Sequence, residues 1–319
     1  SDLYVTYMGL SSMKKIFLTG ANGMVGKNIL AHAASAGFIW LTPSSRELDL
    51  TNQQAVDAFL AAEKPDVIIH AAGMVGGIQA NIAKPVDFMV HNMRMGMNVL
   101  HGAMLAGVPQ VLNLGSSCMY PRDAPNPLRE NMVLDGELEP TNEGYAIAKV
   151  AAARLCDYIS KQTPDLQYKT AIPCNLYGLH DHFETNRSHM IPAVIHKLHE
   201  AKEASATHVD IWGDGLSRRE FMFASDLADF VFYALGHFGV MPAMLNVGLG
   251  TDITINEYYQ AIANVVGYIG EFEHDLSKPS GMRQKLVDTQ LLQTFGWQAP
   301  TSLEQGLSVT YQHYLDLQQ

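Results

Sequence analysis

Short apolar runs alternate along the chain with longer stretches whose apolar residues recur every three or four positions. The short runs predict buried β-strands at residues 15–19, 38–41, 66–70, 111–114 and 169–172. The longer stretches predict amphipathic helices at 24–36, 53–63, 86–106 and 143–161. Apolar strands that alternate with helices indicate an α/β fold with a doubly wound parallel sheet.

The regular alternation ends near residue 178, where shorter elements and glycine turns follow. We therefore expect a main domain at 13–178. Residues 179–319 should form mainly a smaller C-terminal substrate-binding lobe, with some segments returning to the main domain. Residues 1–12 are expected to be an extension outside the fold. Ligands of such sheets bind beyond the carboxyl ends of the strands, which are here Gly20, Thr42, His70, Gly115 and Pro173.

Composition and charge narrow the classes of partner. The formal net charge of −11 argues against a nucleic-acid surface or an anionic membrane surface. No apolar run approaches the roughly 20 residues of a membrane span, and the first 13 residues do not resemble a signal peptide. The three cysteines (Cys118, Cys156 and Cys174) form neither a C-x-x-C pair nor a disulfide framework. We expect a cytoplasmic protein without a metal site.

The first strand runs into a glycine-rich segment, T-G-A-N-G-M-V-G, that opens the first helix. Glycines allow a tight turn and close approach of the backbone to a pyrophosphate, and the helix N-terminus supplies N–H groups. The segment predicts dinucleotide binding in a Rossmann domain by Gly20, Ala21, Asn22, Gly23, Met24, Val25 and Gly26.

The end of the second strand bears on which dinucleotide binds. NAD usually meets an acidic residue there, but no acid precedes Glu47. Ser45 and Arg46 suit a 2′-phosphate, so the sequence favours NADP, with NADPH as the hydride donor. Arg46 as an ordinary solvated charge is the alternative. Asp49, followed by Leu50, is placed to meet the adenine.

Two further motifs carry candidate chemistry. Tyr145 and Lys149 lie four residues apart in Y-A-I-A-K, on one face of a predicted helix. An ammonium beside a phenol is expected to lower the pKa of the phenol, which makes it a usable proton donor. The fourth strand ends in G-S-S-C-M-Y-P, where Ser116 can orient a carbonyl. Cys118 adds a thiol, either as a proton-transfer group or as simple packing.

These motifs, with H-A-A-G-M-V-G-G-I, P-C-N-L-Y-G and W-G-D-G-L-S-R-R-E-F, resemble the extended short-chain dehydrogenase/reductase superfamily and, within it, the GDP-L-fucose synthases. The resemblance spans about residue 13 to the C-terminus. It implies 3,5-epimerisation of GDP-4-keto-6-deoxy-D-mannose and NADPH-dependent reduction at C4 to GDP-L-fucose. It also implies a homodimer that packs helices 86–106 and 143–161 against their mates.

The resemblance assigns roles residue by residue. Ser116 orients the C4 carbonyl, Tyr145 protonates its oxygen, and Lys149 holds the ribose. Cys118 and His189 serve as the base and the acid of epimerisation, in an order left open. Inversion beside a ketone needs two such groups on opposite faces of the ring.

The implied binding residues form two sets. Besides the glycine loop, the segment after the second strand and the catalytic residues themselves, the NADP set contains Ala71, Ala72, Gly73, Leu114, Gly115, Pro173, Asn175, Leu176 and His189. The set for the GDP-4-keto-deoxy-hexose contains Ser117, Cys118, Asn175, Lys197, Trp212, Arg219 and Lys285.

Departures from the family pattern leave alternatives open. Asn22 and Ser45 stand where arginines are usual, and Lys197 also replaces an arginine; Leu179, His182 and Ser280 differ as well. Most of these differences lie on the substrate side, so GDP-L-colitose synthase, which inverts only C5 of a 3,6-dideoxy substrate, is the alternative. An inactive dinucleotide-binding sensor is a remote one, because every proton-handling residue is present.

Overall fold

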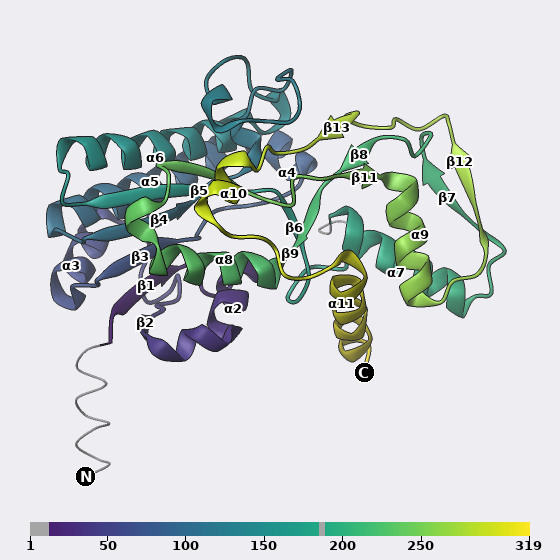
Figure 1. The fold of residues 1–319 in the computed structure, drawn as a ribbon, viewed down its shortest axis with the longest axis horizontal. Coiled ribbons are helices and arrows are strands. Elements are labelled where there is room, and N and C mark those ends of the chain that lie inside the picture. Colours follow the sequence, from purple (N-terminus) through teal and green to yellow (C-terminus); the bar gives the residue numbers. More distant parts are fainter. Residues whose placement is uncertain (1–12, 185–188) are drawn as a thin grey trace, which may run out of the picture.

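The computed structural model describes residues 13–184 and 189–319. A six-stranded sheet with order β10-β5-β4-β3-β1-β2 forms its centre (Figure 1), and every neighbouring pair is parallel. The doubly wound fold expected from the sequence is thereby confirmed. The strands are β1 Lys15–Thr19, β2 Ile39–Leu41, β3 Val67–His70, β4 Gln110–Leu114, β5 Gln167–Pro173 and β10 Met244–Val247.

Helices cover both faces of this sheet. The helices α3, α5 and α6 lie on one face and α2 and α8 on the other (Figure 1). Their bounds are α2 Met24–Ala31, α3 Gln53–Glu63, α5 Pro85–Ala106, α6 Glu143–Gln162 and α8 Ala224–Gly236. The short α4 Ile78–Ala83 precedes α5, and the short α10 Gln290–Phe295 packs beside β10.

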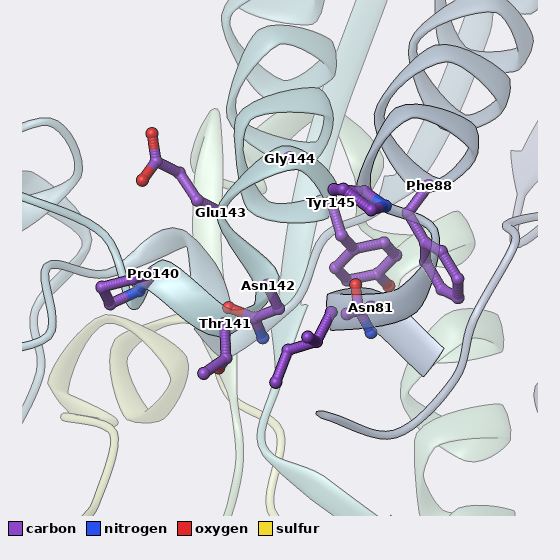
Figure 2. Close-up of a pocket in the computed structure, with 10 residues that line it drawn as sticks. Asn81, Phe88, Pro140, Thr141, Asn142, Glu143, Gly144 and Tyr145 are labelled. Carbon is purple, nitrogen blue, oxygen red and sulfur yellow. The ribbon is translucent and has the colours of Figure 1, made fainter. Parts of the chain in front are cut away.

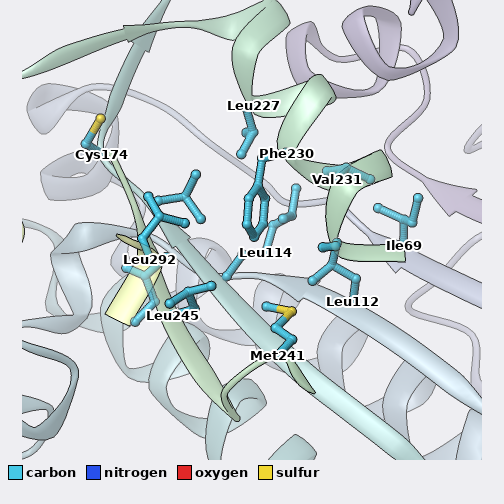
Figure 3. Packing of buried hydrophobic residues seen from close by; sticks show 14 of the residues in the cluster. Ile69, Leu112, Leu114, Cys174, Leu227, Phe230, Val231, Met241, Leu245 and Leu292 are labelled. Carbon is cyan, nitrogen blue, oxygen red and sulfur yellow. The ribbon is translucent and has the colours of Figure 1, made fainter. Parts of the chain in front are cut away.

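Alternate residues of each central strand enter different cores, which explains why the strands are apolar throughout. In β1, Ile16 and Leu18 face the core beneath α8, whereas Phe17 faces the core beneath α3 and α5. Figure 3 shows Leu227, Phe230 and Val231 of α8 packed over the sheet. Burial of large apolar side chains on both faces contributes most of the stability of such a layered fold.

A second group of elements forms a lobe beyond the carboxyl ends of the central strands (Figure 1). Its core lies among three helices, α7 Met190–Glu203, α9 Ile255–Val266 and α11 Leu303–Leu317. Its strands form three small sheets: β7 His208–Trp212 with β12 Glu271–Asp275, β6 Asn175–Tyr177 with β9 Phe221–Phe223, and β8 Arg218–Arg219 between β11 Ile253–Thr254 and β13 Gln284–Lys285.

Several boundaries differ from the sequence-based prediction. The helix expected at 24–36 ends at Ala31, and Ala33–Gly37 forms a 3-10 turn. The change occurs at His32, whose ring accepts from the backbone N–H of Ala34 at 3.0 Å and pairs with Asp229 of α8 at 2.9 Å. The short α4 was not expected, because six residues are too few to show a helical period. None of the described helices is both long and apolar enough to cross a membrane.

Candidate active site

The glycine loop after β1 forms a compact turn against the end of β3. Gly20 has φ +71°, and a Cβ there would lie 2.8 Å from the Ala71 carbonyl carbon. Gly26 packs its Cα against the Gly20 carbonyl oxygen, which a Cβ would approach to 2.3 Å. Asn22 and Gly23 are exposed at the start of α2. The loop therefore has the cradle form that suits a pyrophosphate, with free helix N–H groups beside it.

A buried hydrogen-bond group behind the loop was not expected from the sequence. The Thr19 hydroxyl accepts from the backbone N–H groups of Ala71 and Ala72, both at 3.0 Å, and donates to Nδ1 of His70 at 2.8 Å. Burial, with Lys149 nearby, lowers the pKa of His70 to about 3, so the ring is neutral. This group fixes the segment from Ala71 to Gly73 beside the loop.

The segment after β2 is a polar turn on the surface. Ser44 and Glu47 cap each other, with the Ser44 N–H donating to the Glu47 carboxylate at 3.0 Å. Ser45 and Arg46 are exposed at the tip of this turn, where a 2′-phosphate can reach both. Asp49 is also exposed, and its carboxylate accepts from Thr51 at 2.7 Å.

Tyr145 and Lys149 lie on one face of α6 beside the end of β4. The Lys149 ammonium donates to the carbonyl oxygen of Leu114 at 3.2 Å and lies 5.6 Å from the centroid of the Tyr145 ring. The expected lowering of the phenol pKa is not seen. Burial raises the pKa of Tyr145, with a further contribution from Cys118, and burial lowers the pKa of Lys149. In this protein desolvation is the main cause of the shift in the Tyr145 pKa.

The residues after β4 turn toward the same place. Ser116 caps the 3-10 turn Ser117–Met119, and its hydroxyl accepts from the Cys118 N–H at 3.4 Å. Burial raises the pKa of the Cys118 thiol, while Ser116, Lys285 and Lys149 act in the opposite direction. The structure thus brings together Ser116, Cys118, Tyr145 and Lys149, as the sequence predicted.

A cavity of about 270 Å³ adjoins Tyr145, and its remaining walls come from α4, the start of α5 and the segment before α6. Figure 2 shows the Tyr145 ring pointing into it beside Asn81 and Phe88. Asn142 also lines it, and the side-chain oxygen of Asn142 is buried with no hydrogen-bond partner among the described residues. Nothing in the sequence indicated Asn81 or Phe88, and Asn142 was marked only by its position just before Y-A-I-A-K.

A second, smaller pocket includes Ser117 of the turn after β4. It is lined by Ser117, Cys174, Asn175, Glu220, Lys285 and Val287. Lys285 of β13 stands opposite Arg219 of β8, so two cations are neighbours in one small sheet. Burial lowers the pKa of both groups, and Arg219 lowers that of Lys285 further. Two adjacent, partly buried cations favour an anionic ligand.

Two further residues of the predicted substrate set, Trp212 and Lys197, contact other side chains or backbone of the lobe. Trp212 is 59% exposed, with the Lys278 ammonium 5.2 Å from its ring. The Lys197 ammonium donates to the Asp210 carbonyl and lies over the Tyr259 ring.

His189 is exposed at the start of α7, next to residues 185–188, which lie outside the described part of the chain. Among the described residues no hydrogen bond joins His189 to Ser116, Cys118, Tyr145 or Lys149. Asp181 lies near enough for His189 to lower its pKa, although burial raises that pKa more strongly.

Comparison with known proteins agrees with this geometry. The NAD dependent epimerase/dehydratase family matches residues 16–248. The chain belongs to this family. Among relatives, the GDP-L-colitose synthase of Yersinia pseudotuberculosis is 57% identical over 95% of this chain and 98% of its own. The GDP-L-fucose synthase of Azorhizobium caulinodans is 47% identical over 95% and 96%.

A solved structure is also similar to this chain. The GDP-D-glycero-L-gluco-heptose synthase from Campylobacter jejuni, crystallised in the presence of NADPH, has a TM-score of 0.88 and 29% identity, covering 96% of this chain and 98% of that one. The resemblance to GDP-L-fucose synthases seen in the sequence motifs is thereby confirmed.

Three residues of the site, Glu220, Thr19 and His70, were given no role from the sequence. The available signal for Glu220 was its place as the acidic residue inside R-R-E-F.

Proposed function

We propose that this protein is an NADPH-dependent epimerase/reductase that converts GDP-4-keto-6-deoxy-D-mannose to GDP-L-fucose. The observation that carries the proposal is the group of Ser116, Cys118, Tyr145 and Lys149 at the end of β4. A hydroxyl and a phenol can hold a carbonyl oxygen while a thiol two residues away handles a proton on the neighbouring carbon.

The residues present fit NADP(H). Gly20, Gly23 and Gly26 leave room for a pyrophosphate at the N-terminus of α2, and Ser45 and Arg46 are free to meet a 2′-phosphate. Lys149 would hold the nicotinamide ribose. When bound, the cofactor supplies a hydride to C4. The heptose synthase crystallised with NADPH supports this assignment by analogy.

The chain's own residues would work in two stages. In epimerisation, Cys118 and His189 remove and return a proton on opposite faces of the sugar, while Ser116 and Tyr145 stabilise the enolate oxygen. In reduction, Tyr145 gives its proton to the C4 oxygen as C4 becomes a secondary alcohol. The same two residues at the C4 oxygen, Ser116 and Tyr145, would thus serve both stages.

The two parts of the chain would divide the binding. We assign the cofactor to residues 13–178 and the GDP sugar mainly to 179–319, with Asn175, Lys197, Trp212, Arg219 and Lys285 facing the sugar nucleotide. Support comes from the adjacent cations Arg219 and Lys285 and from the exposed Trp212, whose ring can stack on a base.

A homodimer formed through α5 and α6 is part of the proposal. The two helices pack on each other and expose Val86, Leu105 and Tyr158, which a second copy could cover. Sedimentation analysis of the purified protein would test it. A cytoplasmic location is consistent with three free cysteines in the described residues.

GDP-L-colitose synthase is the second candidate, and the 57% identity to the Yersinia enzyme, against 47% to the Azorhizobium enzyme, favours it. Its substrate lacks the 3-hydroxyl, so only C5 would be inverted.

The deciding experiment supplies both 4-keto sugars with NADPH, follows absorbance at 340 nm and identifies the product by NMR. A clear preference for the 3-hydroxylated substrate supports fucose, and the reverse supports colitose. Turnover of neither sugar, despite binding of NADPH, would favour the sensor and overturn the proposal.

A further inference from the structure

Glu220 is a carboxylate buried between two strands of the lobe. It lies between β8 and β9 and is 2% exposed. One of its oxygens accepts from the backbone N–H groups of Leu249 at 2.7 Å and Gly250 at 2.8 Å. The other accepts from the N–H of Val287 at 3.2 Å. Three N–H groups on one carboxylate form an anion-binding arrangement supplied entirely by the backbone.

The loop after β10 is shaped around this carboxylate. Gly250 has φ +72°, which turns its N–H in the same direction as that of Leu249. A Cβ on Gly248 would lie 2.8 Å from the Glu220 carboxylate and 2.7 Å from the Val287 side chain. The two glycines therefore permit the close approach that Glu220 requires.

Val287 belongs to a strap, residues 284–288, that also carries Lys285. On one side the strap pairs with β8, where Lys285 is opposite Arg219. On the other side the Asn126 side-chain oxygen accepts from the Leu286 N–H at 2.8 Å. The pairing of the strap with β8 ends after Lys285. Beyond that point the Val287 N–H donates to the Glu220 carboxylate instead of to a backbone carbonyl of β8.

We propose that Glu220 is a positioning residue that holds Lys285, and with it Arg219, in place for the sugar nucleotide. The inference rests on the proposed function, which gives these cations a GDP sugar to contact. Glu220 itself lies on the same small pocket as Lys285, but its bonds go to the backbone of the strap and of the loop after β10. It acts through the cations rather than on the reacting atoms.

The ionisation of Glu220 should make KM for the GDP sugar depend on pH. Burial outweighs the three N–H groups and raises its pKa to about 7, with Asp252 adding to the effect. The other titratable groups around it are Cys174 before β6, Tyr258 of α9 and Lys285 of β13. Above pH 7 the Glu220 carboxylate is ionised, and both of its oxygens accept hydrogen bonds from backbone N–H groups. Below pH 7 one oxygen carries a proton and loses its hydrogen bond from the backbone. KM for the GDP sugar should therefore rise as pH falls below about 7.

The test is a double-mutant cycle with Glu220→Gln and Lys285→Met. Glutamine keeps the shape but places an NH₂ against backbone N–H groups, so we expect KM for the GDP sugar to rise about ten-fold. The value of kcat should change less than about two-fold, and the dissociation constant of NADPH should stay the same. In the Lys285→Met background, Glu220→Gln should raise KM by less than about two-fold.

The matched control is Glu257→Gln, an exposed carboxylate of the same lobe that caps α9 through Thr254. It should leave KM and its pH profile unchanged. Equal effects of Glu220→Gln in both backgrounds, or a loss of NADPH binding, would show a merely structural role and overturn the inference. If Glu220→Gln does not fold, Glu220→Asp and the wild-type pH profile replace it; a KM that is flat from pH 6 to 8 overturns the inference.

The same cycle can be run on the dissociation constant of GDP, measured by calorimetry without turnover. If the enzyme turns over a keto sugar but the effects of Glu220→Gln and Lys285→Met are additive, only the positioning role of Glu220 is overturned. Absence of turnover with both keto sugars defeats the proposed function, while coupled changes in GDP affinity still support Glu220. Failure of the wild-type protein to bind GDP overturns both.

Discussion

The proposed cofactor side and the proposed sugar-nucleotide side of this site are built in different ways. The cofactor side uses consecutive strand ends of one parallel sheet, and its fixing contacts, such as Thr19 with His70 and Ala71, join neighbouring strands. The sugar-nucleotide side uses two- and three-stranded sheets held by contacts such as Glu220 to Val287 and Asn126 to Leu286. The first is set by topology, whereas the second depends on individual long-range side-chain bonds.

This difference predicts how far the effect of a substitution should spread on each side. A parallel sheet keeps its strand ends in place through many backbone hydrogen bonds, so one substitution in a loop there should act locally. A two-residue strand such as β13 has few ladder bonds. Its position depends on bonds to its ends, and loss of one should move the cations it carries.

The largest effect is expected where the two sides meet, at Tyr145. Tyr145→Phe removes the proton donor and keeps the ring beneath the Lys149 ammonium. Reduction of the keto sugar should fall by about 10³-fold, while NADPH binding, measured by fluorescence titration, should be unchanged. Tyr158→Phe, on the exposed face of the same helix, is the control. Normal turnover in Tyr145→Phe would remove it from the proton-donor role.

Cys118 should separate the two stages of the reaction. Cys118→Ser should slow the incorporation of solvent deuterium next to the ketone by about 10²-fold, because a serine hydroxyl ionises far less readily than a thiol and so provides almost no anionic base near neutral pH. Hydride transfer to an already epimerised ketone, measured at 340 nm, should change little. If both rates fall equally, Cys118 supports the 3-10 turn after β4 and takes no proton.

The sequence predicted the central strands and the segments at their ends well, because these signals are local. The positions of β1, β3 and β4, the glycine loop and the pair Tyr145 and Lys149 all follow from spacing within short segments. The sign of the Tyr145 pKa shift did not follow, because it depends on how deeply the packed lobes bury the phenol. Burial is a property of the whole fold, and spacing along a helix does not report it.

The sugar-nucleotide side shows the opposite case. Family resemblance pointed to Arg219 and Lys285, but nothing in the chain order indicated that Glu220 holds the strap 67 positions later in the sequence. A single acidic residue between two short strands is ordinarily a surface residue. Its meaning appears only when the glycine turn after β10 and the strap come to either side of it.

Two glycines of the cofactor loop should respond differently to the same change. Gly26→Ala places a methyl group 2.3 Å from a backbone oxygen, so it should destabilise the protein by about 1–3 kcal/mol and lower Tm. Gly23→Ala meets nothing closer than 3.5 Å, so the fold should remain. Its methyl group would still stand at the start of α2 and should weaken NADPH binding about ten-fold. Unchanged affinity in Gly23→Ala would argue against a pyrophosphate at this helix end.

Arg46 should give the smallest effect, because its side chain lies on the exposed turn after β2 and any contact with a phosphate is screened by salt. Arg46→Ala should lower affinity for NADPH about five-fold at low ionic strength and leave affinity for NADH unchanged. The comparison of the two cofactors by fluorescence titration isolates the 2′-phosphate, since they differ only there. Arg122→Ala, a surface arginine paired with Glu137 away from the loop, is the matched control. Equal losses for both cofactors would mean that Arg46 holds the turn itself, and the choice of cofactor would then rest on Ser45 and the backbone around it.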